Sequence, residues 1–192
     1  YSDDGSAWMT QRDEGIEKTL LRAIASDRKC LVPYITGGFD GYLEAISAAA
    51  EAGADAIEIG IPFSDPVMDG PTIQRANDLV LSAGVTPAQI IDEVASLDVD
   101  VPLAVMTYYN VVYRFGLQRL ASNLKEARIS GVILPDLPLV EAGSWQEAST
   151  SAEREAILLA APTTTETHLK TICQETKGFV YAVGLLGITG AR

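Results

Sequence analysis

Short runs of consecutive apolar residues alternate with segments of helical periodicity through most of this chain, and this alternation limits the possible folds more than any other feature. The apolar runs cover 31–35, 56–61, 101–106, 131–134, 156–160 and 179–183. Residues with the spacing of an amphipathic helix occupy 14–25, 42–52, 72–82, 87–96, 117–127, 140–152 and 166–175. Strands that are apolar at successive positions are covered on both faces, which is typical of a parallel sheet with crossover helices. The pattern therefore predicts an α/β protein.

Polar residues at the ends of these runs favour a closed barrel over an open sheet. No glycine-rich phosphate-binding sequence follows the first run, and polar side chains stand at most strand ends: Thr36, Glu58, Tyr108, Asn110, Asp136 and Thr163. We expect a (β/α)8 TIM barrel with only about six β/α units present, because such barrels usually need about 250 residues and this sequence has 192. The expected organisation is a flexible N-terminal tail at 1–13 and a barrel domain at 14–192 that is C-terminally incomplete.

The acidic composition argues against several classes of partner. Fourteen Lys and Arg residues against 26 Asp and Glu residues give a net charge of −12, so nucleic-acid binding is not expected. No apolar run approaches the roughly 20 residues that span a bilayer, and the first residues lack a secretory apolar segment. We therefore predict a cytoplasmic protein that binds no membrane. Cys30 and Cys173 lack the spacing of a disulfide framework or a metal site, so we expect two buried thiols and no metal.

Two carboxylates in the segment 54–74 are the strongest candidates for chemistry. Glu58 lies in an apolar run, where a charged side chain is costly unless it is paired or used. Burial raises the pKa of a carboxyl towards neutrality, as a general acid or base requires, but a strand-end glutamate held by a salt bridge fits the pattern equally well. Asp69 follows in a proline-rich loop and precedes Gly70, so it can be a site residue or a turn or helix cap.

The segment ADAIEIGIPFSDPVMDGPTIQ at 54–74 closely resembles the signature of the tryptophan synthase alpha subunit family. Four further segments agree in order and spacing: LVPYITGG from Leu31, MTYYN from Met106, ILPDLP from Ile133 and YAVGLLGITGAR from Tyr181. Five ordered motifs are far more specific than one short pattern. The resemblance implies a (β/α)8 barrel that cleaves indole-3-glycerol phosphate to indole and glyceraldehyde 3-phosphate in complex with a beta subunit. Pyridoxal phosphate would belong to that beta subunit, and no cofactor is expected in this chain.

The resemblance also implies a role for each matching position. Glu58 matches the catalytic acid/base of a retro-aldol cleavage, and Asp69 matches the carboxylate that binds the indole N–H. The implied substrate-binding positions are Tyr34, Thr36, Tyr108, Tyr181, Thr189 and Gly190, of which the last two lie in a glycine-rich segment that closes over substrate. The implied contacts with the beta subunit are Pro62, Asp65, Pro66, Asn110 and Val112.

Departures from the family pattern leave alternatives open. Met68 replaces a residue that is frequently small, which we expect only to repack the loop, and Asp136 is expected to have a structural or interface role. The family's phosphate-binding loops follow the seventh and eighth strands, beyond residue 192. Two other interpretations therefore remain. The chain can be a stand-alone lyase that releases free indole, or a non-catalytic fragment that binds a beta subunit.

Overall fold

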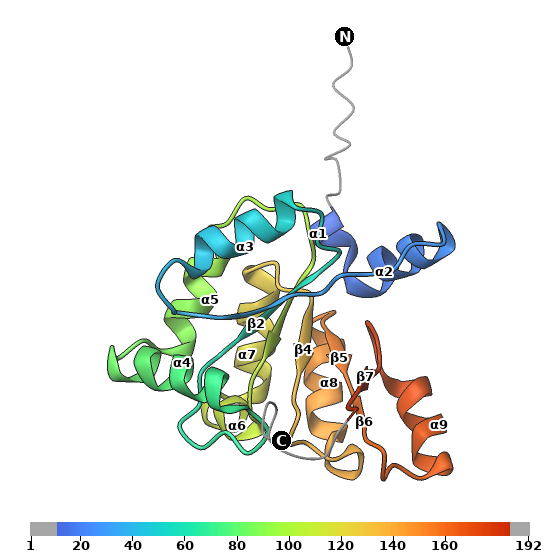
Figure 1. Cartoon of the computed structure of the whole chain (residues 1–192). Coiled ribbons are helices and arrows are strands. Elements are labelled where there is room, and N and C mark those ends of the chain that lie inside the picture. The colour runs from blue at the N-terminus through green and yellow to red at the C-terminus, as the bar shows by residue number, and fades with distance from the viewer. Residues whose placement is uncertain (1–10, 185–192) are drawn as a thin grey trace.

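A computed structural model describes residues 11–184, and these form a curved parallel sheet surrounded by helices (Figure 1). The strands are β1 (Tyr34–Thr36), β2 (Ile57–Gly60), β3 (Leu103–Met106), β4 (Gly131–Ile133), β5 (Glu155–Ile157), β6 (Leu159–Ala160) and β7 (Tyr181–Ala182). They pair in parallel in the order β1-β2-β3-β4-β5, with β6 paired to β7. The prediction of a parallel α/β protein is therefore confirmed.

Helices connect the strands and cover the outer face of the sheet (Figure 1). They are α1 (Gln11–Glu14), α2 (Ile16–Ala25), α3 (Tyr42–Glu51), α4 (Pro71–Ser82), α5 (Pro87–Ala95), α6 (Tyr109–Phe115), α7 (Leu117–Glu126), the 3-10 turn η1 (Leu139–Glu141), α8 (Gly143–Ser151) and α9 (Glu166–Glu175). Local signals explain several boundaries. Thr86 and Gln89 form a capping box at the start of α5, and the Thr165 hydroxyl accepts a hydrogen bond from the His168 N–H at the start of α9.

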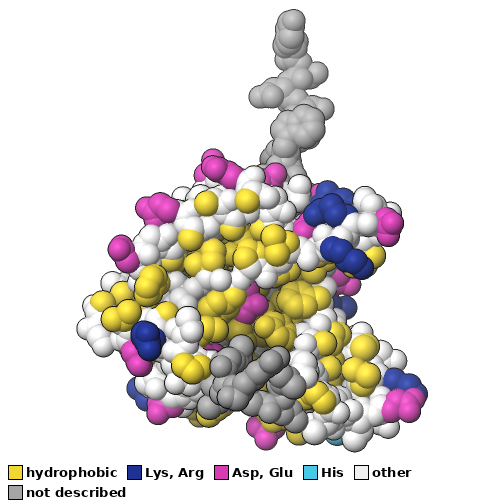
Figure 2. Space-filling model, viewed as in Figure 1, with side chains coloured by type: hydrophobic (Ala, Val, Ile, Leu, Met, Phe, Trp, Pro, Cys, Tyr) yellow, Lys and Arg dark blue, Asp and Glu magenta, His cyan; other side chains and the backbone are white. Residues whose placement is uncertain are grey.

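The strands are apolar at successive positions because they separate two hydrophobic cores. Ile59, Val105 and Val132 belong to the outer core, which the sheet shares with α3, α5, α7 and α8. Ala104, Ile133 and Ile157 face the inner core instead. Figure 2 shows hydrophobic side chains gathered over the centre of one face of the molecule, with most of the charged side chains towards its rim.

The fifth predicted strand is broken in two, which the sequence pattern did not indicate. Leu158 stands between β5 and β6, and its N–H bonds to the Thr176 hydroxyl, at 3.0 Å, instead of to a neighbouring strand. β5 completes the five-stranded sheet, whereas β6 begins the pairing with β7. The break redirects the chain, so that Leu159 and Tyr181 reach the functional site described below.

Helix α6 was also missed, since the segment was read only as the end of a strand. Its first N–H, that of Tyr109, donates to Asp136 Oδ1 at 2.8 Å. A carboxylate at this position satisfies one of the helix's orphan donors and interacts favourably with the helix dipole. Asp136 therefore has the structural role that the sequence suggested, by fixing the loop after β4 to the start of α6.

Helix α2 packs against the inner core of the sheet with Ile16 and Leu20. Its first two N–H groups, those of Ile16 and Glu17, donate to the two carboxylate oxygens of Glu155 at 2.8 and 2.9 Å. Glu155 follows α2 by more than 130 residues and belongs to β5. Its carboxylate thus caps a helix from across the molecule.

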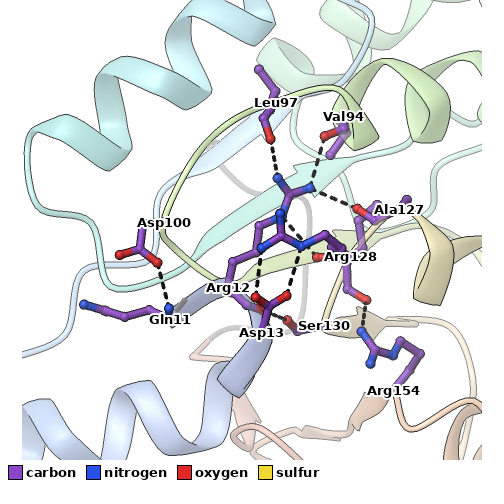
Figure 3. Close-up of polar contacts among 11 residues, drawn as sticks. Gln11, Arg12, Asp13, Val94, Leu97, Asp100, Ala127, Arg128, Ser130 and Arg154 are labelled. Atoms are coloured by element: carbon purple, nitrogen blue, oxygen red, sulfur yellow. Dashed lines mark hydrogen bonds and ion pairs between the residues drawn. The ribbon is translucent and has the colours of Figure 1, made fainter. Parts of the chain in front are cut away.

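Residues 11–13 are anchored, so the predicted flexible tail is wrong for this part of the chain. Arg12 lies in α1 and is only 1% exposed. Its guanidinium donates to backbone carbonyls of Val94, Leu97, Ala127 and Arg128 (Figure 3). The periodicity analysis missed α1 because four residues are too few to show a repeat.

The two cysteines differ in exposure. Cys30 is partly buried, and its thiol lies 3.8 Å from the carbonyl of Leu20. Cys173 is exposed on α9, so the prediction of a buried thiol is wrong at this position. Among the described residues, no helix is both long and apolar enough to cross a bilayer.

Candidate functional site

A cavity of about 220 Å³ opens among the strands and loops that carry the predicted catalytic residues. Polar groups are contributed by Tyr34 of β1, Glu58 of β2, Asp69 of the following loop and Tyr181 of β7. The remaining lining is apolar and comes from Met68, Ile73, Met106, Pro135, Leu159 and Val183. A small apolar chamber with a few convergent polar groups is typical of a small-molecule site.

Glu58 is buried in this cavity without a fixed partner. Its side chain is 4% exposed, and its Oε1 atom has no hydrogen-bond partner among the described residues. Burial, followed by the nearby charge of Asp69, raises the pKa of Glu58 to about 7. The alternative interpretation, a glutamate held by a salt bridge, does not fit this environment. Glu58 is instead a carboxyl that can give or take a proton near neutral pH.

Asp69 is held firmly by three surrounding side chains. The Tyr108 hydroxyl donates to its Oδ1 at 3.2 Å, and the Asn77 amide donates to its Oδ2 at 3.0 Å. Gln74 donates to its backbone carbonyl at 2.8 Å. Burial raises the pKa of Asp69, while the hydrogen bonds from Tyr108 and Asn77 oppose that rise. The two donors favour the charged form and orient it.

Tyr34 forms one wall of the cavity because the neighbouring strand carries no side chain at Gly60. A Cβ atom placed on Gly60 would lie 2.0 Å from the Tyr34 hydroxyl and 2.5 Å from its Cζ. Burial raises the pKa of Tyr34 to about 12, and a hydrogen bond from Thr36 partly offsets this rise. Thr36 is not in the cavity lining. Its hydrogen bond with the Tyr34 hydroxyl gives it a supporting role in this wall.

The other predicted substrate-binding positions divide into three groups. Tyr181 lines the cavity, and burial together with the charge of Glu58 raises its pKa. Tyr108 is buried behind Asp69, where its hydroxyl also accepts a hydrogen bond from the Met68 N–H at 3.0 Å. Thr189 and Gly190 lie outside the described residues.

Three residues near the site were missed or misjudged from the sequence. Asn77 and Gln74 hold Asp69, and Met68 lines the cavity instead of only repacking the loop. Asn77 gave a signal that could have been used. It is a polar residue on the buried face of α4, where an amide needs a partner. No comparable pattern marks Gln74 or Met68.

Two of the predicted partner contacts line a larger groove of about 570 Å³. Asp65 and Asn110 line this groove and are exposed, and Pro66 is partly exposed. Val112 and Pro62 are buried within the chain, and Val112 packs in the outer core. Their burial within the chain argues against direct contact with a partner and leaves the exposed Asp65 and Asn110 as the stronger candidates.

The arrangement of the two carboxylates supports proton transfer. Among residues 11–184, no group of three or more His, Cys, Asp or Glu side chains could hold a metal ion. The sole histidine, His168, is exposed on α9 and is not part of the cavity lining. Two carboxylates in unlike environments, one shielded and one hydrogen-bonded, are a pattern found in acid/base catalysis.

Comparison with known proteins identifies the family. Residues 20–192 match the family model described as "Tryptophan synthase alpha chain". The alpha chain of Methanosarcina mazei is 45% identical over 84% of this chain and 61% of its own length. The alpha chain of Streptomyces avermitilis is 40% identical over 98% of this chain and 70% of its own length. The chain therefore spans 61% of the length of the first relative and 70% of the length of the second.

Solved structures agree with the sequence comparison. A structure of Mycobacterium tuberculosis tryptophan synthase superposes with a TM-score of 0.86 at 36% identity, over 92% of this chain and 70% of that one. Tryptophan synthase subunit alpha from Legionella pneumophila superposes with a TM-score of 0.82 at 34% identity, over 91% of this chain and 68% of that one. These neighbours are TIM barrels, in agreement with the predicted fold. On both sequence and structure, the chain belongs to the tryptophan synthase alpha chain family.

Proposed function

We propose that this chain cleaves indole-3-glycerol phosphate to indole and glyceraldehyde 3-phosphate. The observation that carries the proposal is Glu58: a buried carboxyl with a pKa of about 7 and one unpartnered oxygen in an apolar cavity. A retro-aldol cleavage of this substrate needs a proton donated to indole C3 and another removed from the glycerol hydroxyl, and one carboxyl with a pKa near neutrality can do both. Family membership supports the same activity.

The proposed reaction returns Glu58 to its starting state. The Glu58 carboxyl donates its proton to indole C3, which places positive charge on the ring nitrogen. The resulting carboxylate then takes the proton of the adjacent glycerol hydroxyl. As the carbonyl forms, the C–C bond breaks and its electron pair returns to C3, so indole and the aldehyde leave together. One proton is given and one is recovered, and no cofactor is needed in this chain.

Asp69 would stabilise the positive charge that develops on the indole N–H. A negative group held in place before the reaction lowers the barrier most effectively when it need not reorganise. Tyr108 and Asn77 hold the two carboxylate oxygens of Asp69 in this way. The apolar lining provided by Met68, Ile73 and Met106 strengthens the interaction by excluding water.

Replacing Asn77 with alanine should lower kcat/KM about 10-fold to 100-fold, because Asp69 then loses one of its two side-chain donors. The expected loss falls on kcat more than on KM, since the charge on the indole nitrogen develops only during the reaction. Steady-state indole release measures both constants. Gln74→Ala is a matched control that removes the backbone contact alone. Unchanged kcat in Asn77→Ala would contradict the role given to Asp69.

The function is tested by measuring indole release from indole-3-glycerol phosphate, with Glu58→Gln as the inactive control. The assay is run on the chain alone and with a tryptophan synthase beta subunit added. Activity that is lost in Glu58→Gln supports the lyase. Stimulation by the beta subunit favours an alpha subunit over a stand-alone enzyme. Absence of activity in both conditions would overturn the lyase proposal and leave a non-catalytic binding role.

We further propose that the chain works in the cytoplasm with a beta subunit that carries pyridoxal phosphate. Asp65 and Asn110 are exposed on the groove beside the site and are the best candidates for contact with it. Membership of a family described as the alpha chain of tryptophan synthase supports a partner chain. The groove would then be covered in the complex.

Asp65→Asn should weaken the complex about 10-fold, since a charged hydrogen bond at an interface is replaced by a neutral one. Asp65 is exposed and bonded by the Ser64 hydroxyl at 2.6 Å, so the variant leaves the fold intact. A calorimetric titration with the beta subunit measures the affinity. Intrinsic cleavage should change less than affinity does. Equal affinity of the variant and the original chain would remove Asp65 from the interface.

A further inference from the structure

The guanidinium of Arg12 joins the C-terminal ends of two helices that are far apart in sequence. Its Nη2 atom donates to Val94 O in the last turn of α5 at 3.1 Å and to Ala127 O just after α7 at 2.9 Å. Nη1 donates to Leu97 O and Nε to Arg128 O. Figure 3 shows these acceptors converging on one guanidinium from both sides. A single side chain therefore completes the ends of both helices.

The physical properties of arginine suit this position. The last carbonyls of a helix have no partner within the helix and carry partial negative charge. A planar fork of donors satisfies several of them in one fixed geometry, which an ammonium group does not. Arg12 is 1% exposed, and within residues 11–184 its guanidinium bonds only to carbonyls. Burial lowers its pKa, but not enough to remove the charge at ordinary pH.

The segment around Arg12 is itself tied down on both sides. Ser130 donates from its hydroxyl to the Arg12 carbonyl at 3.2 Å, and the Gln11 N–H donates to Asp100 Oδ1 at 2.7 Å. Arg128 donates from Nε and Nη2 to the two carboxylate oxygens of Asp13. The guanidinium is thus fixed relative to the sheet as well as to the helices (Figure 3).

The opposite ends of the same two helices line the groove described above. Pro87, the first residue of α5, and Arg119, in the first turn of α7, both belong to its walls. Each helix is about 14 Å long. Between the two ends the helices share apolar contacts in the outer core, including Ile91 and Leu120. Apolar contact is non-directional, whereas hydrogen bonds have a preferred distance and angle and so fix the axial position of a helix.

We propose that Arg12 is a positioning residue that locks α5 against α7 from their C-terminal ends and so sets the groove at their N-terminal ends. Residue 12 then influences partner binding without touching the partner. The link to a beta subunit rests on the proposed function. The locking of the two helices does not.

Hydrogen exchange tests the locking directly in the full chain. Arg12→Met keeps an unbranched apolar stem but removes every donor, and we expect exchange to become at least 10-fold faster in α5, α7 and the groove segment 110–119. Exchange in α9, which Arg12 does not contact, should stay unchanged. Arg22→Met is the matched control, because Arg22 is exposed and pairs with Glu14 on the surface. Faster exchange only in the last turns of α5 and α7 would overturn the positioning role.

A second variant keeps the test informative if Arg12→Met does not fold. Arg12→Lys retains the charge and most of the stem but cannot reach four carbonyls at once, so an intermediate rise in exchange is expected. A rise as small as that of Arg22→Met would also overturn the proposal.

Titration with a beta subunit tests the consequence for the groove. Arg12→Lys should bind at least 5-fold more weakly, although every groove residue is intact. Unaltered affinity together with faster exchange at 110–119 would refute the effect on binding. Failure of the original chain to bind would instead refute the proposed partner, and hydrogen exchange would still decide whether Arg12 locks the helices.

Discussion

Glu58→Gln should make the protein more stable above pH 7 while strongly lowering the rate of cleavage. The pKa of Glu58 is about 7 in the folded chain, against 4.5 for an ordinary glutamate. The folded state therefore binds this proton more tightly than the unfolded state does. The protonated carboxyl contributes its full stability below pH 4.5, and this contribution is lost as pH rises through 7. The loss amounts to roughly 3 kcal/mol when complete. Glutamine cannot ionise, so the variant does not undergo this loss of stability.

Urea unfolding at pH 5 and pH 8 measures this effect. The variant should gain stability over the original chain at pH 8 and much less at pH 5. Glu155→Gln is a matched control, because the Glu155 carboxylate accepts two backbone N–H groups of α2 and its replacement should destabilise. An equal gain for Glu58→Gln at both pH values would show that ionisation of Glu58 is not its cause.

The same variant should lower indole release about 10²-fold to 10⁴-fold, the usual contribution of a general acid or base. In the proposed reaction the protonated carboxyl is the starting form. The kcat of the original chain should therefore fall as pH rises above about 7, as Glu58 loses its proton. Residual activity in Glu58→Gln should lack this dependence. A kcat that rises through pH 7 would instead assign the ionised form to the first step.

Gly60→Ala should impair both folding and activity, because the new Cβ atom would lie 2.0 Å from the Tyr34 hydroxyl and 2.5 Å from its Cζ. Real Cβ atoms do not approach other atoms so closely, and Tyr34 must move. The side chain can leave only by entering the cavity or by shifting β1, which pairs with β2 at this point. We expect a destabilisation of about 1–3 kcal/mol and a loss of activity of at least 10-fold.

A double-mutant cycle identifies the cause of that loss. In a Tyr34→Ala background the clashing ring is gone, so Gly60→Ala should have little further effect on stability. Thermal unfolding of the four proteins gives the coupling between the two positions. Additive effects would mean that glycine is required at position 60 for a reason other than Tyr34. Gly143→Ala is the matched control, because no atom lies near the position of its new Cβ. Gly53→Ala is unsuitable, because φ is +93° at Gly53.

Sequence reasoning predicted the parts of this structure that depend on repeated local patterns. Helix α9 begins and ends where periodicity placed it, and Glu58 stood out because a charge interrupts an apolar strand. A periodic pattern over several residues does not depend on any single residue, and a charged residue within an apolar strand has few physical explanations. The two catalytic candidates, Glu58 and Asp69, do lie together in one cavity.

Features that depend on distant contacts could not be predicted in this way. The sequence does not distinguish Arg12 from other charged residues, because its acceptors Val94 and Ala127 lie 82 and 115 residues away in the chain. The break at Leu158 coincides with a hydrogen bond to Thr176, and the burial of Val112 depends on α6, a helix that periodicity did not predict. In each case the deciding partner lies outside the window in which periodicity operates.

The capping of α2 by Glu155 has a consequence for biosynthesis. The N–H groups of Ile16 and Glu17 leave the ribosome 139 and 138 residues before their acceptor does. At about 5–20 residues per second this delay is on the order of ten seconds. During that interval the inner core into which Ile16 and Leu20 pack is incomplete, because Ile157 has not yet been made. Helix α2 is therefore synthesised early but is capped only after residue 155 has been made. Slow translation before residue 155 would prolong the exposure of this segment to chaperones and proteases.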